Sequence, residues 1–259
     1  MDKFIKNSKI TEPISNYKKN QPFPHTVIDN LWEEEFLKKV KGEVDVFDKW
    51  DGIKEFDGSI GKRYCNSPEK LPHYVLKTLN YCNSSKFLNY LENLTGEIGL
   101  IPDPFFMGGG IHSTINKGFL EMHVDFNWYE KLKLYRRLNV LIYLNVDWQL
   151  NWAGDLILAN LSKNGFSNQK KISPIFNRTV IFTTTDHSFH GHPEKLNVPL
   201  GISRNSLALY YYVSEKPLES GYIKRIGTDY RNEKGKLLIN LQRRIFIKMK
   251  NLIPKKIIL

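Results

Sequence analysis

Between residues 108 and 213 the chain consists of short β-branched and aromatic runs with no helical pattern between them. Gly, Asn and Pro turns separate the runs, which is typical of β-strands. The six runs are IHSTI (111–115), FLEMHVDF (119–126), RLNVLIYLN (137–145), GDLILA (154–159), RTVIFTT (178–184) and SLALYYYV (206–213). Consecutive strands without crossover helices predict an antiparallel sandwich or barrel rather than a parallel α/β sheet.

The first 107 residues have a different pattern, in which apolar residues recur at helical spacing. We expect three helices there, in IDNLWEEEFLKKVKGEV (28–44), EKLPHYVLKTLNY (69–81) and SSKFLNYLENLTG (84–96). Asp29 and Asn30 are the candidate N-caps of the first helix. The chain therefore divides into an N-terminal helical segment that packs on the core (1–107), a β core (108–215) and a basic helical extension (216–259).

The net charge of +11 is concentrated in the C-terminal extension. Residues 221–259 contain eleven Lys and Arg and two acidic residues, a net charge of +9, so the rest of the chain is nearly neutral. A nucleic-acid-binding function is therefore disfavoured, because the core adds no basic patch. The segment 234–259 alternates apolar and basic residues. It favours either an amphipathic helix docked on the core or peripheral binding to an anionic membrane or glycolipid.

The composition of the chain bears on its cellular location. The chain has no apolar run of 18 or more residues and a mean hydropathy of −0.41, which argues against a membrane-spanning helix. Its N-terminus has no apolar signal-peptide region. Two cysteines, Cys65 and Cys82, form no CxxC pair and cannot build a disulfide framework. We expect a cytoplasmic protein.

His123 and Asp125 lie two positions apart in one of the expected strands. Side chains i and i+2 of a strand point to the same face, so the two lie side by side. They are either a solvated pair on an outer face or two metal ligands aimed into a cavity. With seven histidines and twelve aspartates in the chain, one His-x-Asp pair is a weak signal by itself.

The turn before the last expected strand adds three histidines, His187, His190 and His192, followed by Arg204 and Ser206. Two histidines and one carboxylate on one side of a metal, with open positions opposite, suit non-haem iron(II) chemistry. An arginine binds the carboxylate of a co-substrate in a bidentate manner. Ser206 shares the strand face of Arg204 and can add a hydrogen bond. Strand register alone does not choose between His190 and His192, which point the same way.

With these elements in this order, the chain resembles the Fe(II)/2-oxoglutarate-dependent dioxygenases, in particular their prolyl-4-hydroxylase-like branch. The matching stretches are His123-x-Asp125, RRLNVLIYLNVDWQLNWAGDLIL (136–158), VIF and SFHGHP (180–193) and Arg204-x-Ser206. The resemblance extends over about residues 23–213, because PFPHTVIDNLW is similar to the start of this branch. It implies a mainly β (α+β) fold, whose core is a double-stranded β-helix of the jelly-roll or cupin-like type, with flanking helices.

The resemblance also implies roles for individual residues. His123, Asp125 and His190 correspond to the iron ligands and so to the catalytic centre; His190 is preferred over His192 and His187 because similar proteins use the first histidine of an HGHP-like turn. Arg204 corresponds to the residue that binds the far carboxylate of 2-oxoglutarate, with Ser206 beside it. Tyr143 is a further candidate for binding 2-oxoglutarate, and an aromatic residue packed in a strand is the alternative interpretation. Asn139 is expected to be an ordinary polar strand residue.

The function implied is hydroxylation of an organic substrate, with Fe(II) as cofactor, 2-oxoglutarate and dioxygen as co-substrates, ascorbate as a candidate further cofactor, and release of succinate and CO2. A peptidyl proline, an amino acid, and a glycan or lipid-linked small molecule are the candidate substrates. The segments around 50–65 and 160–175 are expected to be substrate-facing loops and carry no recognisable motif. One alternative is a non-catalytic or differently metallated cupin-like binding module. Another is an interaction protein that works through its basic tail.

Overall fold

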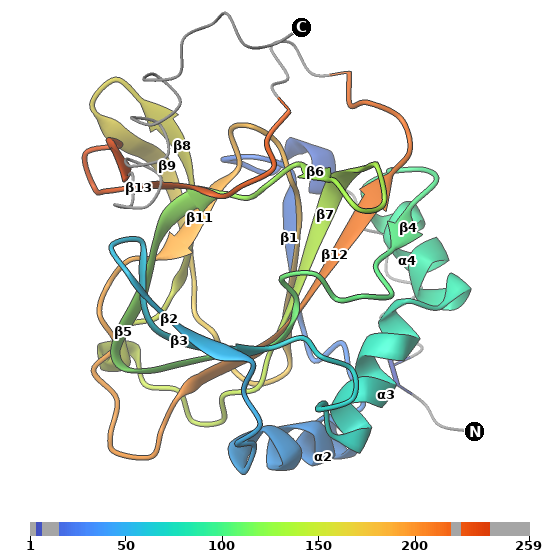
Figure 1. The fold of residues 1–259 in the computed structure, drawn as a ribbon, viewed down its shortest axis with the longest axis vertical. Helices are drawn as coiled ribbons and strands as arrows, with labels where there is room; N and C mark the ends of the chain where they lie inside the picture. Colours follow the sequence, from blue (N-terminus) through green and yellow to red (C-terminus); the bar gives the residue numbers. More distant parts are fainter. Residues whose placement is uncertain (1–3, 7–15, 219–223, 239–259) are drawn as a thin grey trace, which may run out of the picture.

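The computed structural model describes residues 4–6, 16–218 and 224–238 (Figure 1). The helical elements are the short 3-10 turns η1 (Tyr17–Lys19) and η2 (Leu150–Trp152) and the α-helices α2 (Glu34–Asp45), α3 (His73–Cys82) and α4 (Ser85–Thr95). The strands are β1 (His25–Asp29), β2 (Gly52–Phe56), β3 (Ser59–Cys65), β4 (Ile101–Pro102), β5 (Gly110–Val124), β6 (Trp128–Tyr129), β7 (Leu134–Tyr143), β8 (Leu156–Ser162), β9 (Gly165–Ile172), β10 (Arg178–Thr183), β11 (Phe189–His192), β12 (Arg204–Val213), β13 (Asp229–Arg231) and β14 (Leu237–Leu238).

The core strands form two antiparallel layers that share strand β5. The first half of β5 pairs with β12, which continues through β7 and β10 to β1. Its second half pairs with β11, which continues through β8 to β9. Figure 1 shows β1, β7 and β12 facing β5, β11 and β8 across the interior. This is a double-stranded β-helix, or jelly roll, so the predicted fold class is confirmed.

The two layers diverge in the middle of β5. Lys117 has a φ of +62°, which is the left-handed region, and Gly118 follows it. A Cβ at residue 118 would lie 2.8 Å from the carbonyl oxygens of Ile60 and Ile115, so only glycine fits there. The sequence predicted two separate strands on either side of this point, and the structure joins them into one bent strand of 15 residues.

The three predicted helices are present and cover the outer face of the first layer (Figure 1). Leu37, Leu79 and Leu91, one from each helix, are fully buried in a single core cluster together with Val140 and Leu207 of the sheet. Burying each such side chain contributes roughly 1.5–3 kcal/mol. This packing fixes which side of β7 and β12 faces the helices and which side faces the interior.

The start of the first helix was predicted wrongly. Asp29 ends β1 and pairs with Arg178 across the sheet at 2.7 Å, and α2 begins only at Glu34. Trp32 donates its indole N–H to Thr179 and its backbone N–H to Asn177. These contacts to the sheet hold residues 30–32 outside the helix, although their spacing is helical.

Strands β1, β2 and β3 were not anticipated in the N-terminal part, which was expected to contain helices and loops. Strands β2 and β3 form a hairpin with the two-residue turn 57–58, and β3 pairs with β5. Residues 50–65 therefore extend the first layer. Most of the other expected loop, 160–175, is also a hairpin, made of β8 and β9.

The C-terminal extension was expected to be helical, and its described part is not. Strands β13 and β14 pair with each other, and β13 adds to the edge of β5, with Tyr230 opposite His123. Residues 239–259, which carry most of the predicted amphipathic segment, lie outside the described residues. None of the described helices is long and apolar enough to cross a membrane.

Candidate metal centre

His123, Asp125 and His190 converge inside the jelly roll. One potential ligand atom from each lies within 4.8 Å of the others, and all three side chains are buried. The Nε2 atom of His123 is 3.6 Å from Oδ1 of Asp125, and Nε2 of His190 is 3.2 Å from Oδ2. The structure thus brings together the three residues that the sequence proposed as ligands.

Strand register produces this convergence. His190 on β11 lies directly opposite His123 on β5, and Asp125 follows at the end of β5. The two backbones approach closely at Gly191, where a Cβ would lie 2.7 Å from the Glu121 carbonyl oxygen. A glycine between the two turn histidines therefore allows β11 to sit against β5.

Both imidazoles are oriented by the same local contact. Nδ1 of His123 lies 2.8 Å from the carbonyl oxygen of Glu121, and Nδ1 of His190 lies 2.9 Å from that of Ser188. A carbonyl oxygen only accepts hydrogen bonds, so each Nδ1 must carry the proton. In the neutral imidazole this leaves the lone pair on Nε2, the atom that faces the centre, which is how metal-binding histidines are usually held.

Burial sets the charge states of these groups. Desolvation, together with the neighbouring His190, lowers the pKa of His123 to about 3, so this imidazole is neutral at physiological pH. Burial alone would raise the pKa of the Asp125 carboxyl. The charge of Arg136 and the contact with His190 outweigh burial and hold that pKa well below its usual range. The centre presents neutral imidazole and ionised carboxylate, the forms that bind metal.

Asp125 is fixed by two residues of β7. Its Oδ2 accepts hydrogen bonds from the guanidinium of Arg136 at 2.8 Å and from the amide of Asn139 at 2.9 Å. Arg136 is 1% exposed, and its guanidinium lies over the rings of Phe126 and Tyr210. Asn139 is therefore part of the centre, contrary to the expectation of an ordinary strand residue.

The donor set fits iron(II). Two imidazoles and one carboxylate occupy one side of the centre, and the cavity lies on the other, as non-haem iron(II) oxygenases require. Hydrogen-bonded backing of all three ligands is also typical of a built metal site.

Arg204 and Ser206, two of the three residues predicted to bind 2-oxoglutarate, line the same cavity, which measures about 150 Å³; Tyr143 lies behind them and is not among its lining residues. Arg204 is buried at the start of β12, where its Nε donates to the Gly154 carbonyl oxygen at 2.6 Å. A second guanidinium nitrogen donates to the hydroxyl of Tyr143 at 3.1 Å. Ser206 lies opposite Tyr143 on the neighbouring strand. Burial raises the pKa of Tyr143, so its hydroxyl stays protonated.

The two other turn histidines have different surroundings. His187 is exposed and does not reach the cavity. His192 is buried and lines the cavity, with Nε2 3.5 Å from the Thr114 hydroxyl, but it does not belong to the three-residue cluster. The ambiguity between His190 and His192 arose because both point inward.

Sequence reasoning missed several residues of this cavity, among them Lys54, Lys62, Arg136, Asn139 and Tyr230. The Asp57-Gly58 turn is a hairpin signal that could have revealed the two lysines. Tyr230 comes from the extension and stacks near His123, with ring centroids 5.2 Å apart. No local pattern indicates its position.

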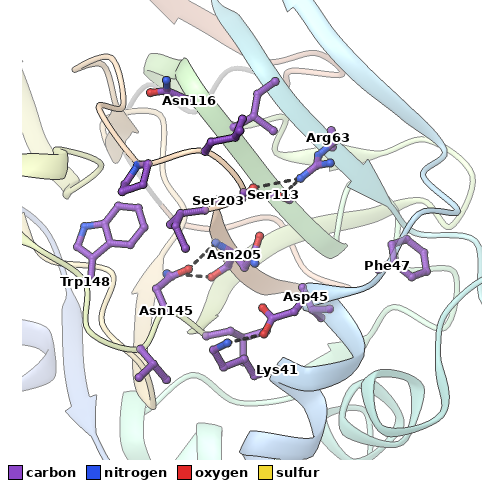
Figure 2. Close-up of a pocket in the computed structure, with 18 residues that line it drawn as sticks. Lys41, Asp45, Phe47, Arg63, Ser113, Asn116, Asn145, Trp148, Ser203 and Asn205 are labelled. Atoms are coloured by element: carbon purple, nitrogen blue, oxygen red, sulfur yellow. Dashed lines mark hydrogen bonds and ion pairs between the residues drawn. The ribbon is translucent and has the colours of Figure 1, made fainter.

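A second cavity of about 680 Å³ lies on the outer side of β3, β5 and β12, beside α2 (Figure 2). Figure 2 shows Arg63 reaching Ser113 and Ser203, and Asn145 facing Asn205. These residues alternate with those that line the metal centre, so the two cavities occupy opposite faces of the same strands.

Comparisons with known proteins agree with this geometry. The sequence model of the 2OG-Fe(II) oxygenase superfamily matches residues 109–212. No curated protein matches the chain in sequence.

Several solved structures share the fold. A prolyl hydroxylase from Trichoplax adhaerens, in complex with a hypoxia inducible factor peptide fragment, has a TM-score of 0.58 at 16% identity, over 79% of this chain and 89% of its own. A prolyl-4-hydroxylase from Pseudomonas putida has a TM-score of 0.51 at 13% identity, over 73% of this chain and 92% of its own. HygX from Streptomyces hygroscopicus, with nickel, 2-oxoglutarate and hygromycin B bound, has a TM-score of 0.53 at 14% identity, over 78% of this chain and 93% of its own.

The jelly roll, the His-Asp-His cluster and the superfamily match define an iron(II)- and 2-oxoglutarate-dependent oxygenase. Residues 109–212 match the 2OG-Fe(II) oxygenase superfamily, and the fold of the chain is similar to that of prolyl hydroxylases.

Proposed function

We propose that this oxygenase hydroxylates an organic substrate at an iron centre held by His123, Asp125 and His190. The observation that carries this proposal is the convergence of two Nε2 atoms and one carboxylate in a buried cavity that also contains Arg204. Bound iron(II), with 2-oxoglutarate and dioxygen, supplies the oxidising power that puts one oxygen atom into a C–H bond and releases succinate and CO2.

The chain's own residues prepare this chemistry. The Glu121 and Ser188 carbonyls keep both histidines in the tautomer that offers Nε2. Arg136 and Asn139 hold Asp125 ionised and prevent it from rotating. Little rearrangement is then needed when the metal binds, and such preorganisation strengthens binding.

Arg204, Tyr143 and Ser206 are the proposed binding residues for 2-oxoglutarate. The guanidinium is anchored by Gly154 and Tyr143 and has donors left for a carboxylate. The Tyr143 hydroxyl and the Ser206 hydroxyl, on adjacent strands, can donate to the same group. An arginine in this buried position also neutralises the far carboxylate of the co-substrate.

Among the candidate substrates, a peptidyl proline is supported by the fold shared with prolyl hydroxylases. A small glycan-like molecule is supported by the fold shared with HygX, which was solved with hygromycin B. Free amino acids remain a third class. The rival proposal, a binding module without turnover, predicts that no substrate induces succinate release.

Turnover tests the proposal. Purified protein with Fe(II), ascorbate and 2-oxoglutarate is screened against proline peptides, amino acids and aminoglycosides, and succinate is measured. We expect release above the substrate-free rate for wild type and for His187→Ala, and loss of release in His123→Ala. His187 is the matched control because it is exposed and lies outside the cluster. Equal succinate release from wild type and His123→Ala would contradict the proposal.

The basic tail is proposed to bind an anionic membrane surface or glycolipid. Residues 239–259 contain six Lys and Arg and no acidic residue, which suits peripheral electrostatic binding. Flotation with phosphatidylserine liposomes compares the full chain with a 1–238 truncation, and equal flotation would refute this role. Cys65 and Cys82 are both free and buried, which supports the cytoplasm as the proposed location.

A further inference from the structure

The β2–β3 hairpin carries two lysines in direct opposition. Lys54 and Lys62 are cross-strand partners in the antiparallel pair. Like charges directly opposite each other on a sheet are destabilising. Such a pair persists in a stable fold when another interaction compensates it.

Both lysines face the cavity of the metal centre. The cross-strand row runs from Lys54 to Lys62 on β3, then to Thr114 on β5 and Arg204 on β12. The lysines therefore lie on the inner face of the same layer as the proposed 2-oxoglutarate site, two and three strands away from Arg204.

Arg63, the next residue along β3, differs from the two lysines in having hydrogen-bond partners. Arg63 points to the opposite face, where it donates to the hydroxyls of Ser113 and Ser203 and lies over the ring of Trp50 (Figure 2). Among the described residues, neither Lys54 nor Lys62 has a hydrogen-bond or ion-pair partner; Lys54 only approaches the ring of Tyr64 at 6.0 Å. The outward cation has hydrogen-bond partners within the protein, and the two inward ones have none among the described residues.

The charges lining the cavity do not balance. Four cationic side chains, Lys54, Lys62, Arg136 and Arg204, face one carboxylate, Asp125. Arg136 is paired with Asp125, and Arg204 is assigned to the far carboxylate of 2-oxoglutarate. The second carboxylate of the co-substrate offsets only one of the two positive charges of iron(II), so nothing in the loaded centre balances the charges of the two lysines.

We propose that the substrate carries an oxyanion, a carboxylate or phosphate group, which binds between Lys54 and Lys62 and holds the adjacent C–H bond at the metal centre. This inference rests on the proposed function and names the chemical class of its substrate. The β2–β3 hairpin, whose two lysines line the cavity, then selects anionic molecules. It disfavours neutral ones, because they leave the ammonium groups of two half-buried lysines uncompensated.

The direction of the pKa shifts of the two lysines agrees with this assignment. Burial lowers the pKa of both lysines, that of Lys62 most strongly, and for Lys62 the charge of Lys54 adds to the effect. An anion between them acts in the opposite direction and favours the charged form of both ammonium groups.

Binding of small anions tests the proposal. Anaerobic protein loaded with Fe(II) and saturating 2-oxoglutarate is titrated at constant ionic strength with sodium sulfate, sodium propionate or neutral propionamide. The visible metal-to-ligand charge-transfer band reports binding. We expect saturable perturbation by at least one anion and none by propionamide. Preference for sulfate indicates a phosphate-bearing substrate, and preference for propionate indicates a carboxylate.

Three variants make the test specific. Lys54→Met and Lys62→Met keep the length of the apolar stem and remove the charge, and Lys163→Met is an exposed control in the β8–β9 turn. We expect each of the first two to weaken anion binding at least about tenfold, with the charge-transfer band retained, and the control to match wild type.

Three outcomes would overturn the proposal. Wild type with a normal band but no saturable anion binding is the first, and unchanged anion affinity in both lysine variants is the second. The third is loss of the 2-oxoglutarate band in the lysine variants, which would assign the lysines to the co-substrate. In all three the wild-type band is intact, so the proposed function survives. Absence of the band in wild type would instead refute the proposed function.

Discussion

Arg136 donates a hydrogen bond to Asp125 at 2.8 Å from a position that is almost completely buried. A buried ion pair is costly to break, because removing one partner leaves an uncompensated charge. Here the pair backs a proposed metal ligand, so its effect should be visible in metal affinity as well as in stability.

We predict that Arg136→Met weakens Fe(II) binding about 10- to 100-fold, as expected when the group that orients a ligand is removed. Competition with a chelator of known affinity measures this. Arg137→Met is the control, because Arg137 pairs with Glu97 away from the centre. Unchanged Fe(II) affinity in a folded Arg136→Met protein would show that Asp125 needs no such support.

A single methyl group at Gly191 should disturb the centre. Its Cβ would lie within 2.8 Å of two carbonyl oxygens of β5, so β11 must move away and carry His190 with it. We predict that Gly191→Ala lowers Fe(II) affinity about tenfold or more. The control is Gly42→Ala in α2, where nothing lies within 4 Å and helix stability should rise by roughly 0.5–1 kcal/mol. Normal Fe(II) affinity in Gly191→Ala would mean that the two strands tolerate separation.

The metal centre should require the C-terminal extension up to residue 238 but not the residues after it. Truncation to 1–238 keeps β13, whose Tyr230 packs beside His123, and we predict normal Fe(II) and 2-oxoglutarate binding. Truncation to 1–218 removes β13 and the ion pair of Arg225 with Asp186, and we predict weaker binding of both. The charge-transfer band measures this. Equal bands from both truncations would show that β13 does not support the centre.

Asp51 should make the β2–β3 region sensitive to acid. Its carboxylate accepts hydrogen bonds from the backbone of Asn66, from the backbone and hydroxyl of Ser67, and from Lys70. Burial alone would raise the pKa of Asp51, but these donors outweigh burial and hold it below the usual range. The stabilisation is therefore complete above the unfolded pKa of about 3.9 and is lost as the pH falls towards the folded value.

We predict that Asp51→Asn destabilises the protein by about 1–3 kcal/mol at pH 7, since several part-buried donors lose a charged acceptor. The difference from wild type should shrink below about pH 4. Urea unfolding at pH 7, 4 and 3 checks this. A difference that stays constant across these pH values would contradict the assigned role of the Asp51 charge.

The sequence predicted the core fold because strand and helix patterns are local. In β7 and β12, side chains alternate between the face covered by the helices and the face that lines the cavity, and this alternation is visible in the sequence of each strand. The bend in β5 was read as a gap between two strands, since a glycine after a polar pair is also a turn signal. Strand β9 was missed because its residues Ser167–Lys171 are polar and exposed or half-buried, so its pairing with β8 is invisible in its own pattern.

The candidate site was predictable only in part, for a similar reason. His123 and Asp125 are adjacent on one strand, and resemblance supplied His190 and Arg204. Asn139, by contrast, reaches Asp125 only through the tertiary packing of β7. The residues next to Asn139 in the sequence do not indicate this contact. Tyr230 depends on a strand pairing with β5 from the far end of the chain.

The central claim is that His123, Asp125 and His190 hold iron beside a 2-oxoglutarate site based on Arg204. The most direct measurement is an anaerobic titration of metal-free protein with Fe(II) and then 2-oxoglutarate, followed by visible absorption. A charge-transfer band should form in wild type, vanish in His123→Ala, and require much higher 2-oxoglutarate in Arg204→Ala. No band in folded wild-type protein that contains stoichiometric iron would contradict the account.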